Sequence, residues 1–279
     1  MSENRWIKRA KLFVLCIVGL SAVSIPVTAA LILSAAGDGS PLALGAPSGV
    51  RAARENPAKA IKESVKCSPT KGYYALTFDD GPYAEATERL VSALKGAGAV
   101  ATFFDVGERV TARPDLVELQ RTVGQVANHS YTHAHLPAVS QGRRFLELTE
   151  TARALGHPNA FVRPPFGETS PATDADIRKT GLVPVYWTTD AYDWQRPPVD
   201  AIVKRALELR PGGIVLLHDG GETTIQAVPR IVTELRNRGM CPGFLAKTDK
   251  TVVSAYKKTK FNVVAVSPRN NSRVAGRHG

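Results

Sequence analysis

Cysteine is scarce in this chain, and the motifs of covalent hydrolases are absent. Only three cysteines occur in 279 residues, and none has a second cysteine or a histidine at metal-ligand spacing. No Gly-x-Ser-x-Gly motif is present. These absences argue against a zinc-thiolate centre and against a mechanism that passes through a covalent acyl-enzyme.

Charge is absent from Leu12 to Ala36, an apolar segment of 25 residues that follows four basic residues. When such a segment enters a membrane, its basic end stays on the inner side. The length matches the ~20 residues of a membrane span, whereas Pro26 and the small residues 34–36 fit a cleaved signal peptide. We expect residues 1–36 to be a signal anchor, with a signal peptide as the alternative. Either one places the remainder on the extracellular, cell-wall side, membrane-anchored or secreted.

Export changes how the cysteines are interpreted. Cys16 lies inside the apolar segment, so Cys67 and Cys241 are the only two in the exported part. In an oxidising compartment an isolated pair is expected to form a disulfide, and two free buried thiols are the alternative. The bond would close a loop of roughly 170 residues and tie the entry of the first strand to the region after the last helix.

The net charge of +11 is concentrated outside the middle of the chain. Residues 72–246 carry 18 basic and 20 acidic side chains, whereas residues 51–71 carry six and two, and residues 247–279 carry eight and one. Basic flanks suit adhesion to anionic wall polymer or lipid headgroups, and solvated linkers are the simpler alternative. A slightly acidic compact part argues against nucleic-acid binding.

From Gly72 onward, short apolar runs alternate with amphipathic stretches. Strands are predicted at residues 73–78, 100–106, 124–128, 161–163, 183–188 and 213–218, and helices at 84–95, 114–122, 143–155, 173–180, 198–209 and 223–238. This alternation predicts an α/β domain over residues 72–246, with a parallel sheet that is open or closed into a barrel. Residues 37–71 are typical of a flexible linker, and residues 247–279 form a basic C-terminal extension in which 261–266 are expected to add a strand.

Two carboxylates end the first predicted strand. Asp79 and Asp80 come immediately before Gly81-Pro82, at the strand end where α/β barrels build their active sites. Neighbouring strand residues point to opposite faces, so the two carboxylates share a site only if the chain turns between or just after them. An ordinary polar turn is the alternative, because Asp, Gly and Pro are common turn residues.

Two histidines follow the third predicted strand. His129 and His133 are four residues apart, so one helical turn would present both imidazoles on one face. A carboxylate from elsewhere would complete a three-ligand metal site that keeps a position open for water. His135 is a candidate substitute ligand that fits helical spacing less well. The pair alone is a weak indication of metal.

Polar residues also end the later strands. Arg163 offers a rigid fork suited to a carboxylate, and after Pro164-Pro165 the first backbone N–H able to reach a ligand belongs to Phe166. A stiff surface loop is the alternative. His218 ends an apolar run and would be a general acid if a carboxylate from residues 190–194 fixed its tautomer, whereas a core or capping histidine is the ordinary interpretation.

The five motifs, taken in order, resemble those of the polysaccharide deacetylase family, carbohydrate esterase family 4, whose catalytic domain is the NodB homology domain. They lie at residues 77–82, 128–135, 163–167, 190–194 and 214–219. The resemblance covers about residues 72–246. It implies a distorted (β/α) barrel of about seven strands and metal-dependent hydrolysis of acetyl groups from N-acetylglucosamine polymers.

The resemblance also implies roles for individual residues. Asp80, His129 and His133 would bind one divalent metal ion, with zinc expected and cobalt or another divalent ion as alternatives. Asp79 would be the general base and Arg163 would hold it, while His218 would be the general acid and Asp193 would orient it. The backbone N–H of Phe166 would donate to the oxyanion. Trp194 and Leu216 would line the pocket for the acetyl methyl group.

Two departures from the family pattern bear on this site. Phe166 stands where the family usually has tyrosine, which matters little if the backbone N–H does the work. The approach to the histidines, residues 124–128, is one residue shorter than usual. Because a one-residue slip reverses the facing of a strand, the turn near Gly124 must absorb the difference or the metal geometry suffers.

The chain is therefore expected to deacetylate N-acetylglucosamine residues of peptidoglycan, a chitin-like polymer or a related extracellular polysaccharide. An esterase that removes O-acetyl groups from xylan or similar glycans is the first alternative. A non-catalytic wall-binding module with the same fold is the second, although such a module would be expected to have lost its base or its ligands.

Overall fold

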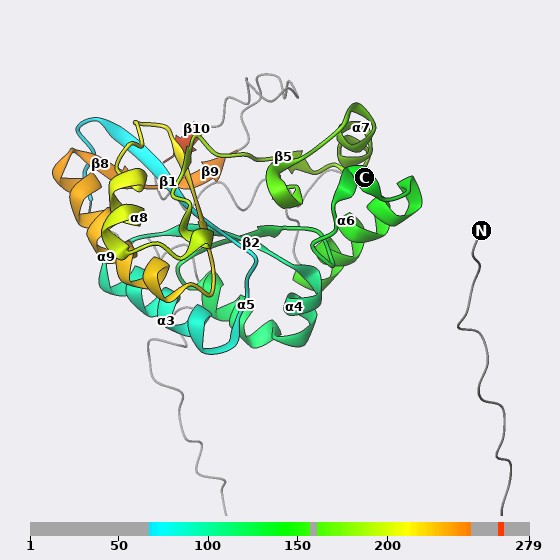
Figure 1. Ribbon diagram of the computed structural model, residues 1–279, viewed down its shortest axis with the longest axis horizontal. Helices are drawn as coiled ribbons and strands as arrows, with labels where there is room; N and C mark the ends of the chain where they lie inside the picture. The colour runs from blue at the N-terminus through cyan, green and yellow to red at the C-terminus, as the bar shows by residue number, and fades with distance from the viewer. Residues whose placement is uncertain (1–66, 157–160, 247–261, 265–279) are drawn as a thin grey trace, which may run out of the picture. The chain divides into compact units, whose positions relative to one another are not determined.

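A curled parallel sheet organises the part of the protein that the computed structural model describes, residues 67–156, 161–246 and 262–264. Seven parallel strands follow one another in the order β5-β4-β3-β2-β1-β7-β6. Helices α3, α4, α5, α6, α8 and α9 form an arc around the sheet (Figure 1). This is the distorted (β/α) barrel expected from the sequence, and within the described residues its end strands β5 and β6 do not pair with each other.

The described elements have the following bounds. The strands are β1 Gly72–Asp79, β2 Ala101–Asp105, β3 Gly124–Asn128, β4 Phe161–Val162, β5 Val183–Pro184, β6 Thr189–Asp190, β7 Ile214–His218, β8 Met240–Pro242, β9 Phe244–Ala246 and β10 Asn262–Val264. The helices are α3 Ala84–Gly96, α4 Gly107–Ala112, α5 Pro114–Arg121, α6 Gln141–Leu155, α7 Pro171–Lys179, α8 Val199–Ala206 and α9 Glu222–Asn237, with short 3-10 turns at Leu136–Ala138, Pro165–Gly167 and Asp193–Gln195.

Strand β1 lies at the centre of the sheet, between β2 and β7. Its residues from Tyr74 to Asp79 are all buried, because a central parallel strand is covered on both faces. The apolar stripe of α9 packs on the same core as Leu76 and Phe78. Asp79 and its register partner His218 thus leave the sheet side by side at the carboxyl ends of β1 and β7.

The described part differs from the sequence-based expectation in several elements, one of which is the short strand β9, which was not predicted. Helix α4 was not predicted, because Gly107–Ala112 is less than two turns long and begins with glycine. The strand expected over residues 183–188 is split into β5 and β6. β8 adds a further parallel pairing to β1, from Gly72 with Met240 to Tyr74 with Pro242.

The short approach to the histidines does not disturb the sheet. Strand β3 pairs with β2 without interruption, from Ala101 with Gly124 to Asp105 with Asn128. A Cβ on Gly124 would lie 2.1 Å from the carbonyl oxygen of Ala101, so only glycine permits this close start of the strand. His129 therefore leaves the sheet directly after a strand in regular register.

The expected disulfide is present between Cys67 and Cys241. Cys241 lies in β8, and Cys67 lies just before β1, the strand with which β8 pairs. The bond spans 174 residues of sequence and therefore closes almost the whole described domain into one loop.

Reduction of this disulfide is expected to destabilise the domain. In the chain-entropy model, a closed loop of this length removes enough disorder from the unfolded chain to stabilise the fold by about 5 kcal/mol. Urea unfolding with and without reductant measures the difference in free energy of unfolding. A Cys67→Ser/Cys241→Ser variant should be indifferent to reductant, and a loss below about 1 kcal/mol in the wild type would contradict the expectation.

Several sequence-based expectations lie outside the described residues. These are the membrane segment at 1–36, the linker at 37–66 and most of the basic extension after residue 246. Among the helices of the described part, none is long and apolar enough to cross a membrane. The described piece of the extension, β10, pairs antiparallel with β9 and lies within the stretch where an added strand was expected.

Candidate active site

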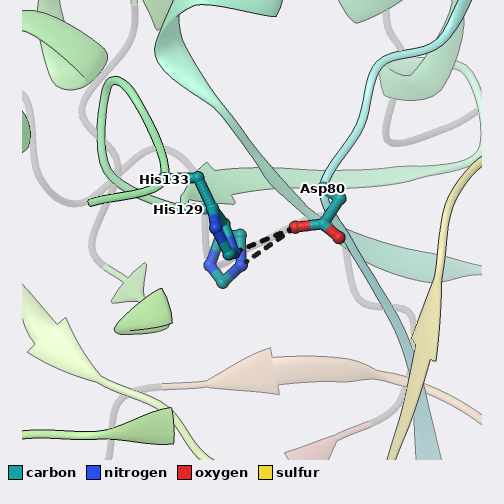
Figure 2. A group of neighbouring side chains, drawn as sticks. All are labelled: Asp80, His129 and His133. Atoms are coloured by element: carbon teal, nitrogen blue, oxygen red, sulfur yellow. Dashed lines mark ion pairs between the residues drawn. The ribbon is translucent and has the colours of Figure 1, made fainter. Parts of the chain in front are cut away.

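One carboxylate and two imidazoles converge beyond the ends of β1 and β3. Asp80 Oδ1 lies 3.4 Å from His129 Nε2 and 3.2 Å from His133 Nε2. All three potential ligand atoms lie within 4.8 Å of one another. Figure 2 shows the two rings on the same side of the Asp80 carboxylate and pointing toward it. This spacing suits a single ion held by three protein ligands.

The backbone turns at Asp80 to bring its side chain into the site. Asp80 follows β1 directly and has a left-handed φ of 72°, so the strand ends between the two carboxylates. As a result both reach the same histidine, with Asp79 Oδ2 3.8 Å and Asp80 Oδ1 3.4 Å from His129 Nε2. The sequence predicted that Asp79 and Asp80 could share a site only if the chain turned between or just after them, and the structure has this turn at Asp80.

The two histidines do not lie on a helical turn, so the expectation of helical spacing was wrong. Residues 129–135 form an irregular loop in which Ser130 and His133 have φ values of 62° and 59°. This loop nevertheless brings the two rings to a centroid distance of 5.0 Å. His135 does not join them. It lies 2.6 Å from Glu168 Oε2 instead.

The donor set fits a divalent metal ion. His129 Nδ1 lies 2.7 Å from the carbonyl oxygen of Arg163, and because a carbonyl only accepts, Nδ1 carries the proton and Nε2 presents its lone pair to the site. Burial lowers the pKa of His133, which favours its neutral form. Burial raises the pKa of Asp80, but its contacts with the two histidines outweigh this and leave it well below the usual value.

Asp79 is held by a fully buried arginine. Arg163 Nη1 donates to Asp79 Oδ1 at 2.6 Å and to Thr77 Oγ1 at 2.9 Å. The guanidinium also lies over the ring of Phe104, 4.2 Å from its centroid. Burial lowers the pKa of Arg163, and the charge of Asp79 opposes this. The salt bridge occupies one oxygen of Asp79 and leaves Oδ2 toward the histidines.

His218 is paired with Asp193 at the end of β7. Asp193 Oδ1 lies 2.8 Å from His218 Nδ1, while Oδ2 accepts from the backbone N–H of His218 at 2.8 Å and from Thr224 Oγ1 at 2.7 Å. Burial alone lowers the pKa of His218, but the hydrogen bond and charge of Asp193, with the charges of Asp79 and Asp80, raise it to about 9. The imidazole is therefore protonated at neutral pH.

The three predicted pocket residues differ in exposure. Phe166 is 60% exposed, has a φ of 62°, and its ring meets His133 edge-on at 4.7 Å between centroids. Trp194 is 57% exposed, in the 3-10 turn that also carries Asp193. Leu216 is buried in β7. Phe166 and Trp194 thus offer surfaces that a ligand can reach, and Leu216 lies beneath the surface.

A buried polar cluster under Gly81 was not predicted. Gln120 Nε2 donates to Asp105 Oδ1 at 3.1 Å, and Thr87 Oγ1 donates to Asp219 Oδ2 at 2.6 Å. A Cβ on Gly81 would lie 2.6 Å from Asp105 Oδ1 and 2.7 Å from Asp219 Oδ2, so only glycine fits above them. Burial raises the pKa of Asp219 to about 6. Both aspartates end or follow apolar strands, which is the feature of the sequence that could have revealed them.

Comparison with known proteins agrees with this geometry. A family model described as polysaccharide deacetylase matches residues 66–185. A chitooligosaccharide deacetylase of Sinorhizobium fredii is 37% identical over 186 residues, which cover 59% of this chain and 86% of the relative. A bifunctional xylanase/xylan deacetylase of Cellvibrio japonicus is 36% identical over 63% of this chain, a match that spans only 27% of that longer protein.

A solved structure shares the fold. The family 4 carbohydrate esterase from Streptomyces lividans in complex with acetate superposes with a TM-score of 0.64 at 34% identity, and covers 71% of this chain and 100% of that one. The relatives from S. fredii and C. japonicus are both named as deacetylases. The matched motifs, the barrel and these relatives together show that this chain belongs to the polysaccharide deacetylase family, carbohydrate esterase family 4.

Proposed function

We propose that this chain is a metal-dependent hydrolase that removes acetyl groups from N-acetylglucosamine residues of peptidoglycan, a chitin-like polymer or a related extracellular polysaccharide. The observation that carries the proposal is the convergence of three potential metal ligands with two separately paired acid–base groups, Asp79–Arg163 and His218–Asp193. Hydrolysis of an amide needs a base for the water and an acid for the leaving nitrogen, and the two pairs supply them.

Asp80, His129 and His133 would hold one divalent ion, with zinc expected and cobalt or another divalent ion as alternatives. When bound, the ion supplies Lewis acidity for the acetyl carbonyl and for water. Asp80 and His133 are only partly buried, at 28% and 30% side-chain exposure, so the ligand set can be reached from solvent. A substrate carbonyl can therefore approach it.

Asp79 acts as the general base. Its Oδ2 faces the site while Arg163 holds Oδ1, so the carboxylate is oriented with one oxygen toward the substrate. It takes a proton from the attacking water as the water oxygen bonds to the acetyl carbon. The N–H of Phe166 would donate to the oxyanion, because the two prolines before it have no N–H to offer.

His218 acts as the general acid. Its imidazolium gives a proton to the sugar nitrogen as the bond between carbon and nitrogen breaks, which releases acetate and the free amine. Asp193 accepts a hydrogen bond from Nδ1–H, so Nε2 is the nitrogen that faces the substrate. Base and acid are the last residues of β1 and β7, and they can serve opposite sides of one acetyl group.

Exposed aromatic side chains support a carbohydrate substrate. Among the described residues, the exposed large apolar side chains are Tyr83, Leu146, Phe166, Tyr192 and Trp194. All but Leu146 follow β1, β4 or β6 at the strand ends that carry the site. Exposed apolar surface gathered at one place marks a binding site, and aromatic rings combine an apolar face with a polar edge. Such a rim suits the faces of sugar rings.

The pH dependence should follow His218. Because only the imidazolium can donate, kcat is expected to fall as pH rises through the pKa of His218, which stands at about 9 and is lowered by a bound cation. Asp193→Asn removes the charge that raises this pKa, so the alkaline limb of the acetate-release profile should move to lower pH. Asp200→Asn, on the exposed surface, serves as the control. An alkaline limb that stays in place in Asp193→Asn would contradict the assignment.

A substrate panel tests the proposal. Purified protein loaded with zinc is incubated with N-acetylated chitooligosaccharides, peptidoglycan and acetylated xylan, and released acetate is measured. We expect release from the N-acetylated glycans, whereas release from xylan alone would support the O-acetyl esterase. No release from any glycan would support the non-catalytic wall-binding module.

Location and partners complete the proposal. We place the domain on the extracellular, cell-wall side, secreted or held by the N-terminal segment, with the basic flanks near anionic wall polymer. N-terminal sequencing of the mature protein distinguishes an anchor from a cleaved signal peptide. A mature protein that begins before residue 12 keeps the apolar segment and supports the anchor. A mature protein that begins near residue 37 supports cleavage of a signal peptide.

A further inference from the structure

The loop that carries His133 is held by side chains that no catalytic role accounts for. Three consecutive backbone N–H groups of this loop, those of Ser130, Tyr131 and Thr132, donate hydrogen bonds to side chains. Asn128 Oδ1 accepts the first at 2.8 Å, and Glu147 Oε2 accepts the next two at 2.8 Å and 2.7 Å. Glu147 lies on α6, 14 residues further along the chain than His133, and its side chain is fully buried.

Glu147 makes its contacts with both carboxylate oxygens. Oε1 accepts from Thr132 Oγ1 at 2.8 Å and from Arg143 Nε at 2.8 Å. A buried carboxylate is costly unless it is paired and hydrogen-bonded, and here four donors satisfy it. Three of the four donors belong to the two residues directly before His133, so the carboxylate is committed to this loop.

The carbonyl groups of the same loop are held from the opposite direction. The backbone N–H groups of Gly107 and Glu108, at the start of α4, donate to the carbonyl oxygens of Ser130 and Tyr131, both at 2.9 Å. A Cβ on Gly107 would lie 2.4 Å from the Tyr131 ring and 2.6 Å from Thr151 Oγ1, so glycine allows α4 to approach. The loop is therefore fixed between α4 and α6.

Such support is needed because the loop is not regular structure. Ser130 and His133 both have left-handed φ values, a conformation that costs energy for residues other than glycine and persists only when the surroundings impose it. A free loop would relax toward ordinary backbone angles. His133 would then leave the position from which its Nε2 faces Asp80.

We infer that Glu147 is a positioning residue for the metal ligand His133. This inference rests on the proposed function, since it takes Asp80, His129 and His133 to be a metal site. The hydrogen bonds and ion pair given for Glu147 go to Tyr131, Thr132 and Arg143, none of which is a proposed ligand. It acts by accepting the N–H groups of Tyr131 and Thr132 and so holding the imidazole of His133 in its binding position, as groups that support metal ligands do elsewhere.

Zinc binding to the protein, after its metal has been removed with a chelator, tests the inference. Glu147→Gln keeps the size of the side chain but replaces one carboxylate oxygen, which accepts hydrogen bonds, with an NH₂ group, which donates them. That NH₂ group would face the N–H or O–H donors that the carboxylate oxygen now accepts from. We expect zinc affinity, measured by calorimetry, to fall about 10–100-fold. Glu150→Gln, on the same helix but paired with Arg153 near the surface, should bind zinc like the wild type. A folded Glu147→Gln variant that binds zinc within twofold of the wild type would overturn the inference.

A second pair of variants decides the case if Glu147→Gln does not fold. Thr132→Val loses only the hydroxyl that donates to Glu147, whereas Thr132→Ser keeps it. We expect Thr132→Val to bind zinc several-fold more weakly and Thr132→Ser to bind like the wild type, with equal unfolding temperatures for the zinc-free proteins. Equal zinc affinity in the two variants would overturn the inference. A wild-type domain that binds no zinc would instead overturn the proposed function.

Discussion

Asp79→Asn is expected to abolish acetate release while leaving zinc bound, and Asp80→Asn is expected to lose the metal. The two residues are adjacent, but Arg163 holds the first and the two histidines face the second. Removal of a general base lowers kcat by about 10²–10⁴-fold. Loss of a direct ligand should weaken zinc binding by more than the roughly 10–100-fold that loss of a supporting group costs.

These matched variants separate the two roles in one experiment. Each protein is dialysed against zinc, its metal content is determined, and acetate release is followed on a chitooligosaccharide. The account requires metal-replete, inactive Asp79→Asn and metal-poor Asp80→Asn. An Asp79→Asn variant with wild-type activity would remove Asp79 from the role of base, and equal zinc affinity in both variants would remove Asp80 from the ligand set.

Arg163→Met is expected to be among the most destabilising substitutions near the site. The guanidinium is fully buried and is the partner of a carboxylate with only 5% of its side chain exposed. When one member of such a pair is removed, the uncompensated buried charge costs about 3–5 kcal/mol. Chemical unfolding of the zinc-free proteins should show a loss of this size. Asp79→Asn/Arg163→Met should lose less than the sum of its single variants, because the stranded charge is then absent.

A matched control uses another buried ion pair between residues that the structure describes. Arg144 Nε lies 2.9 Å from Asp176 Oδ2, and the two side chains are 10% and 2% exposed. Arg144→Met should therefore also lower the free energy of unfolding but leave the kcat of the folded protein near the wild-type value. Equal losses of kcat in Arg144→Met and Arg163→Met would show that general destabilisation, rather than the position of Asp79, sets the rate.

Much of the site could be predicted because its residues stand at the ends of apolar runs. Asp79 and His218 are the last residues of strands, and His129, Arg163 and Asp193 follow strands closely, where a parallel fold gathers side chains at one edge. The different partners of Asp79 and Asp80 were harder to foresee from the residues alone. They depend on Arg163, which is 84 residues away in sequence from Asp79.

The loop of the histidines could not be predicted from local sequence. Four-residue spacing favours a helical turn, but the contacts from α4 and from Glu147 impose left-handed angles at Ser130 and His133 instead. Helix α4 itself is too short to show an apolar stripe. In both cases tertiary contacts override the local preference, and the sequence pattern of the segment itself does not predict those contacts.

Acetate release from a chitooligosaccharide, followed while zinc is added back to the chelated protein, tests the central claim most directly. The account predicts no release before zinc is added. The rate should then rise in proportion to added zinc and reach a plateau at one equivalent, because one carboxylate and two imidazoles make a single site. Release that persists in chelator, or that stays absent at every zinc ratio on this substrate and on peptidoglycan, would contradict it.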